Sequence, residues 1–408
     1  MYFVKKAHRY DQIEFCQKAG SNALPNKITV FSLKFLGRSP IEKFVWEEIK
    51  MLKFAIIGAG AGGQSMAAIL TSKGYTAKLY DIDQEKIRRL RELKTIKVTG
   101  VIECEAAPAV ITDRIEEVLD DVDVIMVVST TDAHRSIAYA CKPYLKDGQI
   151  VMLNPGHCGG ALEIANILRG ENGCGKDLII AEAGDLMYGC RSYEIGNILH
   201  TGLKVHVPVA TLPASDIDRL MDVLGPIFPC LQPAANVLET GFEGAGAMLH
   251  PIPSLMNVNK MDLGQSYDYY MEGITPHIAD IISACDKERV AVCQALGVDA
   301  LALGDMLVKT YKLEPKDDLY DLIQSIDSYR ALRNPTNTKH RFIVEDTMSG
   351  LVPLASVGHA LGIPTPMMDA FVNIASAVCD RNFWEEGRTA EKLGMAGKTP
   401  EEIREMVR

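Results

Sequence analysis

The stretch IIGAGAGGQSMAAIL, residues 56–70, contains the pattern G-x-G-x-x-G at Gly58, Gly60 and Gly63. It follows an apolar segment and leads into residues with a helical pattern. In such a unit the first glycine permits a tight turn, the second lets a pyrophosphate approach the backbone, and the third lets the helix pack on the strand. Free N–H groups at the start of the helix attract the phosphates. Because the pattern stands between a strand and a helix, it predicts a dinucleotide cradle.

Strand and helix patterns alternate on the C-terminal side of this cradle. Three apolar segments there are expected to be strands: residues 76–81, 122–130 and 149–156. The middle one is almost entirely apolar, as in a parallel sheet covered on both faces. The sequence therefore predicts a Rossmann-type, doubly wound α/β domain that binds NAD(P) over residues 51–235.

From about residue 236 onward, long helical patterns replace the strand patterns, so a mostly α-helical substrate and catalytic domain is expected over residues 236–408. Two segments define its expected core. In the first, the apolar face consists of Ile278, Ile281, Ile282, Cys285, Val292 and Leu296. In the second, it consists of Met367, Phe371, Ile374 and Val378.

The composition narrows the class of protein. The chain has 408 residues and a formal net charge of −10, which argues against nucleic-acid binding because such proteins present basic surfaces. No membrane span or signal peptide is recognisable, so a cytoplasmic protein is expected. The ten cysteines form no Cys-x-x-Cys pair, which indicates reduced thiols and no metal site. Residues 1–50 contain no recognisable unit and are expected to be a poorly ordered extension.

Asp81 ends the second expected strand, eighteen residues after Gly63. A carboxylate at this position can accept hydrogen bonds from the adenosine ribose and would repel a 2′-phosphate, so it favours NAD(H) over NADP(H). Arg88 and Arg89 follow closely and argue in the other direction. NAD(H) is therefore the expected cofactor, with NADP(H) as the alternative.

His250 is the histidine to which we give most weight. It is followed by Pro251 and Pro253, and a residue before proline is pushed towards extended backbone. We therefore expect it at the end of a helix, presented rather than packed. Imidazole suits proton transfer near neutral pH. From the residues alone, a structural or merely exposed histidine remains the alternative, since most histidines are not catalytic.

Arg341 and the acidic pair Glu345–Asp346 flank a short apolar segment that is expected to be strand-like. An arginine can bind a carboxylate through two hydrogen bonds. An aspartate can orient an imidazole and stabilise its charged form. An ordinary surface ion pair remains the alternative explanation for these residues.

Several segments together resemble the octopine/nopaline (opine) dehydrogenase family. They are residues 56–68, 153–163, 181–194, 204–214, 250–257, 269–276, 285–297 and 340–355. Members of this family join an amino acid reductively to a 2-oxo acid such as pyruvate, using NAD(P)H. The resemblance implies that His250 is the catalytic acid and base, that Asp346 is its partner and that Arg341 holds a substrate carboxylate. One departure is Thr130, where the family pattern leads us to expect a proline.

Two alternative functions stay open beside this one. A reductase of the ketopantoate or glycerol-3-phosphate dehydrogenase type would act on an oxo acid without an amine and would rely on a lysine, for which Lys260 is the nearest candidate. A module that binds NAD(H) without catalysis is the second alternative. The expected partners are small-molecule substrates, and a homodimer is one option for the assembly.

Overall fold

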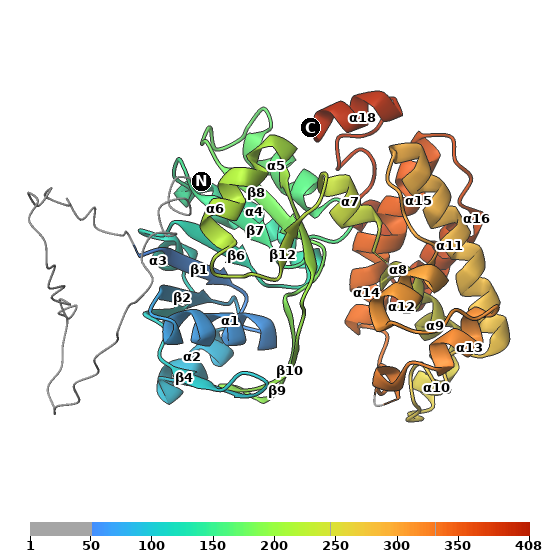
Figure 1. The fold of residues 1–408 in the computed structure, drawn as a ribbon, viewed down its shortest axis with the longest axis horizontal. Coiled ribbons are helices and arrows are strands. Elements are labelled where there is room, and N and C mark those ends of the chain that lie inside the picture. The colour runs from blue at the N-terminus through green and yellow to red at the C-terminus, as the bar shows by residue number, and fades with distance from the viewer. Residues whose placement is uncertain (1–50, 245, 331) are drawn as a thin grey trace, which may run out of the picture. The chain divides into compact units, whose positions relative to one another are not determined.

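The computed structural model describes residues 51–244, 246–330 and 332–408. The extension expected over residues 1–50 lies outside these residues. The predicted combination of a Rossmann-type α/β region and a mostly helical C-terminal region is confirmed. Figure 1 shows the strands in the blue and green part of the chain and the helices of the second region in yellow to red.

Among the described residues, eight strands form the main sheet, in the order β12-β11-β8-β7-β6-β1-β2-β5. Their bounds are β1 Lys53–Ile57, β2 Thr76–Tyr80, β5 Val110–Thr112, β6 Val124–Val127, β7 Ile150–Leu153, β8 Ile179–Ala183, β11 Val207–Leu212 and β12 Leu231–Pro233. Six neighbouring strands of this sheet, β5-β2-β1-β6-β7-β8, are parallel. They follow the order 3-2-1-4-5-6 of a dinucleotide-binding fold. In this order, ligands bind at the carboxyl ends of the strands, where the order reverses between β1 and β6.

Helices cover both faces of this sheet because successive side chains of its strands point to opposite sides. Phe54 and Ile56 of β1 belong to one core with α1 (Ala61–Ser72), α2 (Gln84–Leu93) and α6 (Ile217–Leu224). Ala55 and Ile57 belong to a second core with α3 (Ile115–Leu119), α4 (His134–Cys141) and α5 (Gly160–Arg169). The second core continues into the C-terminal helices. The glycine loop after β1 therefore starts from a strand that is buried on both faces.

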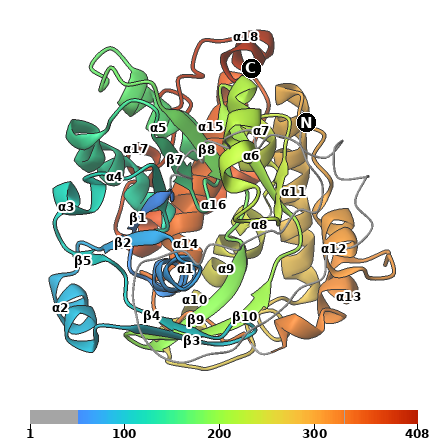
Figure 2. The same cartoon turned by 60° about the vertical axis from the view of Figure 1, so that its left-hand side comes forward.

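A smaller sheet has the strand order β4-β3-β10-β9. Its strands are β3 Ile96–Gly100, β4 Cys104–Ala106, β9 Tyr188–Glu194 and β10 Asn197–Leu203. Figure 2 shows it below the main sheet, on the side of α1. Gln64 of α1 connects the two parts, since its side chain donates to the carbonyl of Ala59 and accepts from the N–H of Gly196. The sequence patterns did not indicate this sheet, because its outer strands carry many polar residues.

The C-terminal region consists of short helices around one long helix. Their bounds are α7 Val237–Phe242, α8 Gly246–Leu249, α9 Pro251–Met256, α10 Val258–Asp262, α11 Pro276–Leu296, α12 Leu303–Tyr311, α13 Leu319–Gln324, α14 Arg341–Asp346, α15 Val352–Ala360, α16 Pro366–Cys379, α17 Phe383–Glu386 and α18 Pro400–Met406. The face predicted for α11 is confirmed: all of its residues are buried except Ile281, which is half-buried.

The face predicted for α16 is wrong in part. Phe371 is buried, but Ile374 is 42% exposed, and Met368, Val372 and Ala375 are buried instead. The helix is apolar over most of its circumference, so its periodicity could not select the face that packs. The face is set by the neighbouring helices.

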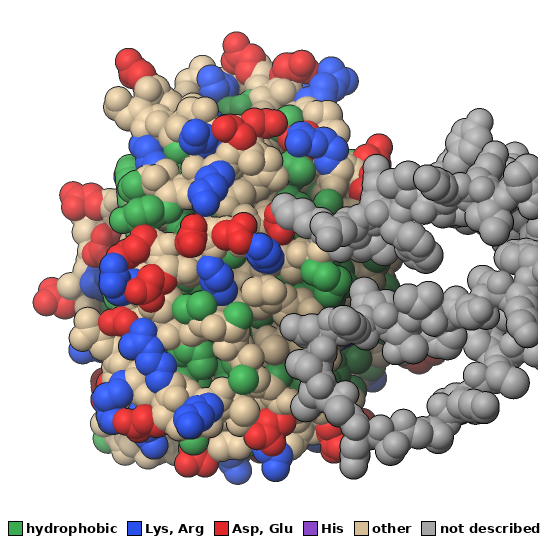
Figure 3. Space-filling model, turned by 90° about the vertical axis from the view of Figure 1, so that its left-hand side faces the viewer, with side chains coloured by type: hydrophobic (Ala, Val, Ile, Leu, Met, Phe, Trp, Pro, Cys, Tyr) green, Lys and Arg blue, Asp and Glu red, His purple; other side chains and the backbone are tan. Residues whose placement is uncertain are grey.

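Among the described residues, none of the helices could cross a membrane. The face of the molecule in Figure 3 carries acidic and basic side chains interspersed with one another. Neither sign of charge dominates this face.

Candidate active site

The glycine loop has the geometry that a dinucleotide needs. Gly58 has a φ of +111°, and a Cβ atom there would lie 2.3 Å from the carbonyl oxygen of Val128. A Cβ atom on Gly63 would lie 1.7 Å from the carbonyl oxygen of Gly58. At Gly60, by contrast, a Cβ atom would meet nothing within 4 Å, and no side chain caps α1. The open space and the uncapped helix start leave room and N–H donors for a pyrophosphate.

Asp81 lies at the carboxyl end of β2, beside this loop. Its Oδ2 accepts from the N–H of Ala59 at 2.7 Å and from Nζ of Lys86 at 3.0 Å, and its Oδ1 accepts from the N–H of Asp83. Lys86 was not considered in the sequence analysis, although it lines the same cavity. Arg88 is engaged elsewhere, in exposed ion pairs.

The loop after β6 forms the opposite wall of the cofactor site. It comprises Val128, Ser129 and Thr130, which line the cavity together with the glycine loop. Thr130 has a φ of −65° and a ψ of 149°. This is the φ at which proline is fixed, so the backbone here has the conformation that the expected proline would impose.

His250 and Asp346 are in contact. Nδ1 of His250 lies 3.1 Å from Oδ2 of Asp346, whose side chain is only 1% exposed. The imidazole also stacks on Phe342, with ring centroids 4.1 Å apart and an interplanar angle of 6°. Burial raises the pKa of Asp346, but the charge and hydrogen bond of His250 outweigh this effect and hold that pKa below its ordinary value. The pair therefore keeps an ionised carboxylate behind the imidazole.

His250 stands between α8 and α9, at the end of a helix as predicted. Its backbone is not extended, however: φ is −109° and ψ is −63°. Helix-type hydrogen bonds run through it, because its N–H donates to the carbonyl of Gly246 and its carbonyl accepts from the N–H of Ser254. The buried hydroxyl of Tyr269 also donates to that carbonyl at 2.6 Å, and these contacts oppose the preference of a residue before proline.

Arg341 begins α14, so the strand-like segment expected between Arg341 and Asp346 is in fact a helix. Glu345 is the fourth residue after Arg341, and in a helix this spacing puts both side chains on one face. Nε of Arg341 lies 3.0 Å from Oε2 of Glu345. Oε1 of Glu345 accepts from the N–H of Thr131 at 2.9 Å. Glu345 therefore connects the arginine to the loop after β6.

Arg388 fixes the same loop from a second direction. Its guanidinium is 3% exposed and donates to the carbonyl of Thr131, contacts Nδ1 of His134 and pairs with Glu163. It also donates to the carbonyls of Gly156 and Cys158. Desolvation and the charge of Arg388 hold the pKa of His134 well below its ordinary value, so this imidazole is neutral in the folded protein.

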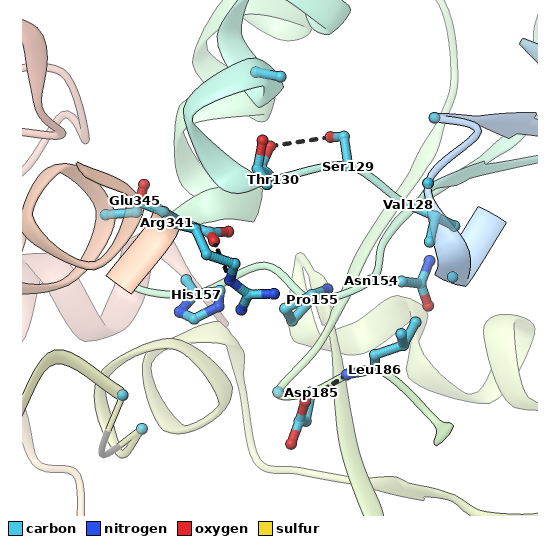
Figure 4. A pocket seen from close by; sticks show the side chains of 18 of the residues that line it. Val128, Ser129, Thr130, Asn154, Pro155, His157, Asp185, Leu186, Arg341 and Glu345 are labelled. Carbon is cyan, nitrogen blue, oxygen red and sulfur yellow. Dashed lines mark hydrogen bonds and ion pairs between the residues drawn. The ribbon is translucent and has the colours of Figure 1, made fainter. Parts of the chain in front are cut away.

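These groups surround one cavity of about 1090 Å³. Gly58, Gly60 and Asp81 line it from the α/β region, and His250 and Arg341 line it from the helical region. In the close view of Figure 4, the guanidinium of Arg341 is directed towards the loop that carries Pro155 and His157. Lys260 is not part of this lining and packs its ammonium over the ring of Tyr267 instead. Within the described residues, no group of three metal-ligating side chains comes together.

Comparison with known proteins places the chain in a family. Residues 233–379 match the model of the NAD/NADP octopine/nopaline dehydrogenase α-helical domain, and residues 53–157 match that of the NAD-dependent glycerol-3-phosphate dehydrogenase N-terminus. An opine dehydrogenase from Arthrobacter sp. strain 1C is 34% identical over 360 residues, which are 88% of this chain and 99% of the relative. The chain belongs to the opine dehydrogenase family.

More distant relatives are similar in sequence or in fold. A tauropine dehydrogenase from Arabella iricolor is 23% identical, over 86% of this chain and 97% of its own length. A structure of octopine dehydrogenase with NADH and agmatine has the same fold, with a TM-score of 0.73 at 18% identity, over 86% of this chain and 97% of the other. A yersinopine dehydrogenase with NADP⁺ bound superimposes with a TM-score of 0.66 at 16% identity, over 88% and 98% of the two chains.

This opine dehydrogenase is an NAD(P)-dependent oxidoreductase that acts on CH–NH groups and joins an amino acid reductively to a 2-oxo acid. Its cofactor is NAD(H) or NADP(H), and the glycine loop has the open space for the pyrophosphate. His250, Asp346 and Arg341, which were predicted from the sequence, all line or adjoin one cavity. Phe342, which stacks on the imidazole, and Tyr269, which binds the carbonyl of His250, were not predicted, although both lie in segments that carry the family resemblance.

Proposed function

We propose that His250, Asp346 and Arg341 are the residues that carry out the condensation. The contact between Nδ1 of His250 and Oδ2 of Asp346, at the wall of the cavity that contains the glycine loop, supports this most directly. An imidazole held through Nδ1 has one tautomer favoured and leaves Nε2 for proton transfer. Stacking on Phe342 further limits rotation of the ring.

In the proposed reaction, the amine nitrogen of the amino acid attacks the carbonyl carbon of the oxo acid, and loss of water gives an imine that is protonated on nitrogen. NAD(P)H supplies the hydride that reduces this imine to a secondary amine. His250 donates the proton that lets the hydroxyl group leave as water. In the oxidative direction, His250 removes the proton from the secondary amine. Asp346 stabilises the imidazolium that exists between these transfers.

Arg341 is proposed to hold the carboxylate of the oxo acid. Its Nε forms an ion pair with Glu345, and the two terminal nitrogens of the guanidinium can give a carboxylate two parallel hydrogen bonds. Because Glu345 also accepts from the N–H of Thr131, the arginine is placed relative to the loop after β6. The oxo acid is thereby oriented towards the cofactor side of the cavity, which is an entropic contribution to catalysis.

A matrix of amino acids against pyruvate, 2-oxoglutarate and glyoxylate tests the proposed chemistry. NADH oxidation is expected only when an amine and an oxo acid are both present, with the secondary amine identified by mass spectrometry. Oxidation with an oxo acid alone would indicate the reductase alternative. Binding of NADH without turnover of any pair would indicate the non-catalytic module.

Three finer points belong to the same proposal. NADH is the preferred cofactor, a point that depends on Asp81. The protein works in the cytoplasm, which agrees with the free thiols of all the described cysteines and would be tested by cell fractionation. A homodimer is the proposed assembly, and light scattering on the purified protein would test it.

A further inference from the structure

The product of the proposed reaction carries two carboxylates, one from each substrate, and Arg341 accounts for only one. Five side chains that can carry a positive charge line the cavity: Lys86, His157, Lys204, His250 and Arg341. Four of these pair with carboxylates of the protein: Lys86 with Asp81, Lys204 with Asp185, His250 with Asp346, and Arg341 with Glu345. The His157 imidazole has no hydrogen bond or ion pair with any described residue.

The backbone presents His157 in an unusual conformation. Its φ is +53°, in the left-handed region that side-chain-bearing residues seldom adopt. The buried guanidinium of Arg388 holds this conformation, because it donates to the carbonyls of Gly156 and Cys158 on either side. The carbonyl of His157 itself accepts from the N–H of Gly160. Strained residues held in this way are concentrated at functional sites, where the strain directs a side chain.

His157 is directed towards the catalytic pair. A Cβ atom on Gly246 would lie 2.9 Å from Oδ1 of Asp346, 3.8 Å from Nδ1 of His250 and 3.9 Å from Cε1 of His157, so the three side chains surround this glycine. The charge of His157 also contributes to lowering the pKa of Asp346. His157 and His250 therefore line the same part of the cavity, where the amino acid is proposed to react.

We propose that His157 binds the α-carboxylate of the amino-acid substrate, while Arg341 binds that of the oxo acid. The inference rests on the proposed function. The two groups come from different elements, His157 from the loop after β7 and Arg341 from α14 (Figure 4). Each carboxylate would therefore be bound by its own side chain.

The variant His157→Gly tests the inference, because glycine adopts a positive φ freely and removes only the imidazole. The amino acid with the highest turnover in the matrix is varied at saturating NADH and pyruvate. KM for this amino acid is expected to rise about 10- to 100-fold, which is the loss of one hydrogen bond to a charged group. KM for pyruvate and the Kd for NADH are expected to stay within about twofold. His157→Lys, which restores a cation, is expected to recover part of the loss.

His206→Gly is the matched control, since His206 is an exposed loop histidine outside the cavity lining and its variant is expected to behave as the wild type. An unchanged KM for the amino acid in His157→Gly would overturn the inference. So would a fall in kcat with both KM values unchanged, which would assign His157 to orienting Asp346, or an equal rise in both KM values. A wild type without turnover would refute the proposed function instead.

Discussion

The contact between His250 and Asp346 makes a specific prediction at the scale of single residues. His250→Ala removes the proton-transfer group, so kcat is expected to fall by about 10²- to 10⁴-fold. Asp346→Asn keeps the shape but favours the wrong tautomer, so its loss is expected to approach that of His250→Ala. The double variant is then expected to be hardly slower than His250→Ala, because groups that act as a unit are not additive. Steady-state kinetics measure all three, and losses that multiply would show that the residues are not partners.

Arg341 predicts a different kinetic signature. Arg341→Ala removes the two terminal nitrogens that face the cavity, so KM for the oxo acid is expected to rise more than KM for the amino acid. Arg341→Lys keeps the charge but not the planar pair of donors, so it is expected to recover only part of the loss. Equal increases in both KM values would argue against a clamp for the oxo acid alone.

Asp81 is expected to set the choice of cofactor. Its carboxylate lies beside the glycine loop and pairs with Lys86, so the wild type is expected to prefer NADH over NADPH. Asp81→Ala removes the repulsion of a 2′-phosphate and releases the ammonium of Lys86. It is therefore expected to reduce the difference between kcat/KM for NADH and kcat/KM for NADPH. The double variant Asp81→Ala with Lys86→Ala separates the two effects. In it the repulsion of the 2′-phosphate is removed, but no lysine ammonium is released. A wild type that prefers NADPH would contradict this assignment.

At the scale of helices and strands, local patterns predicted the glycine loop well and α14 poorly. The glycine loop, the buried strands and the face of α11 depend on neighbours in sequence, and these were predicted. The segment from Arg341 to Asp346 was expected to be strand-like because three apolar residues stand together in it. Its helical form puts Arg341 and Glu345 on one face, and Thr131, more than 200 residues earlier, completes the contact. Such a partner has no signal in a local pattern.

Glu182 joins three elements and makes stability depend on pH. At the end of β8, it accepts from the N–H of Ala161 in α5 and from the hydroxyl of Thr240 in α7, both at 2.7 Å. Burial raises its pKa to about 7. The folded protein therefore binds a proton here that the unfolded chain loses near pH 4.5, and the stability from this group is complete below that pH and declines as the pH rises to about 7.

Titration of Glu182 is expected to lower the free energy of unfolding by about 3 kcal/mol as the pH rises from about 4.5 to about 7. Glu182→Gln cannot titrate, so the variant is expected to lack this part of the decline. Urea unfolding of both proteins at pH 5 and pH 8 measures the difference, and titrating groups shared by the two proteins, such as His134, cancel in it. An identical change with pH in both proteins would show that Glu182 does not titrate in this range.

At the scale of the whole chain, residues 1–50 are expected to be dispensable. The relative from Arthrobacter aligns over 360 residues and is covered almost completely, so it has no counterpart for a stretch of about this length. A protein that begins at Met51 is expected to keep its kcat, its KM values and its affinity for NADH. Loss of NADH affinity or precipitation of the shortened protein would place part of the first fifty residues in the fold.

Arg388 has a consequence for synthesis of the protein. Its partners Thr131 and His134 precede it by 257 and 254 residues, and Gly156 and Cys158 by 232 and 230. At about 5–20 residues per second, a ribosome needs about 13–50 s to proceed from Thr131 to Arg388. During that interval the emerging α/β region lacks the guanidinium that holds two of its cofactor-side loops. A nascent chain released before Arg388 would therefore lack the hydrogen bonds that hold these two loops.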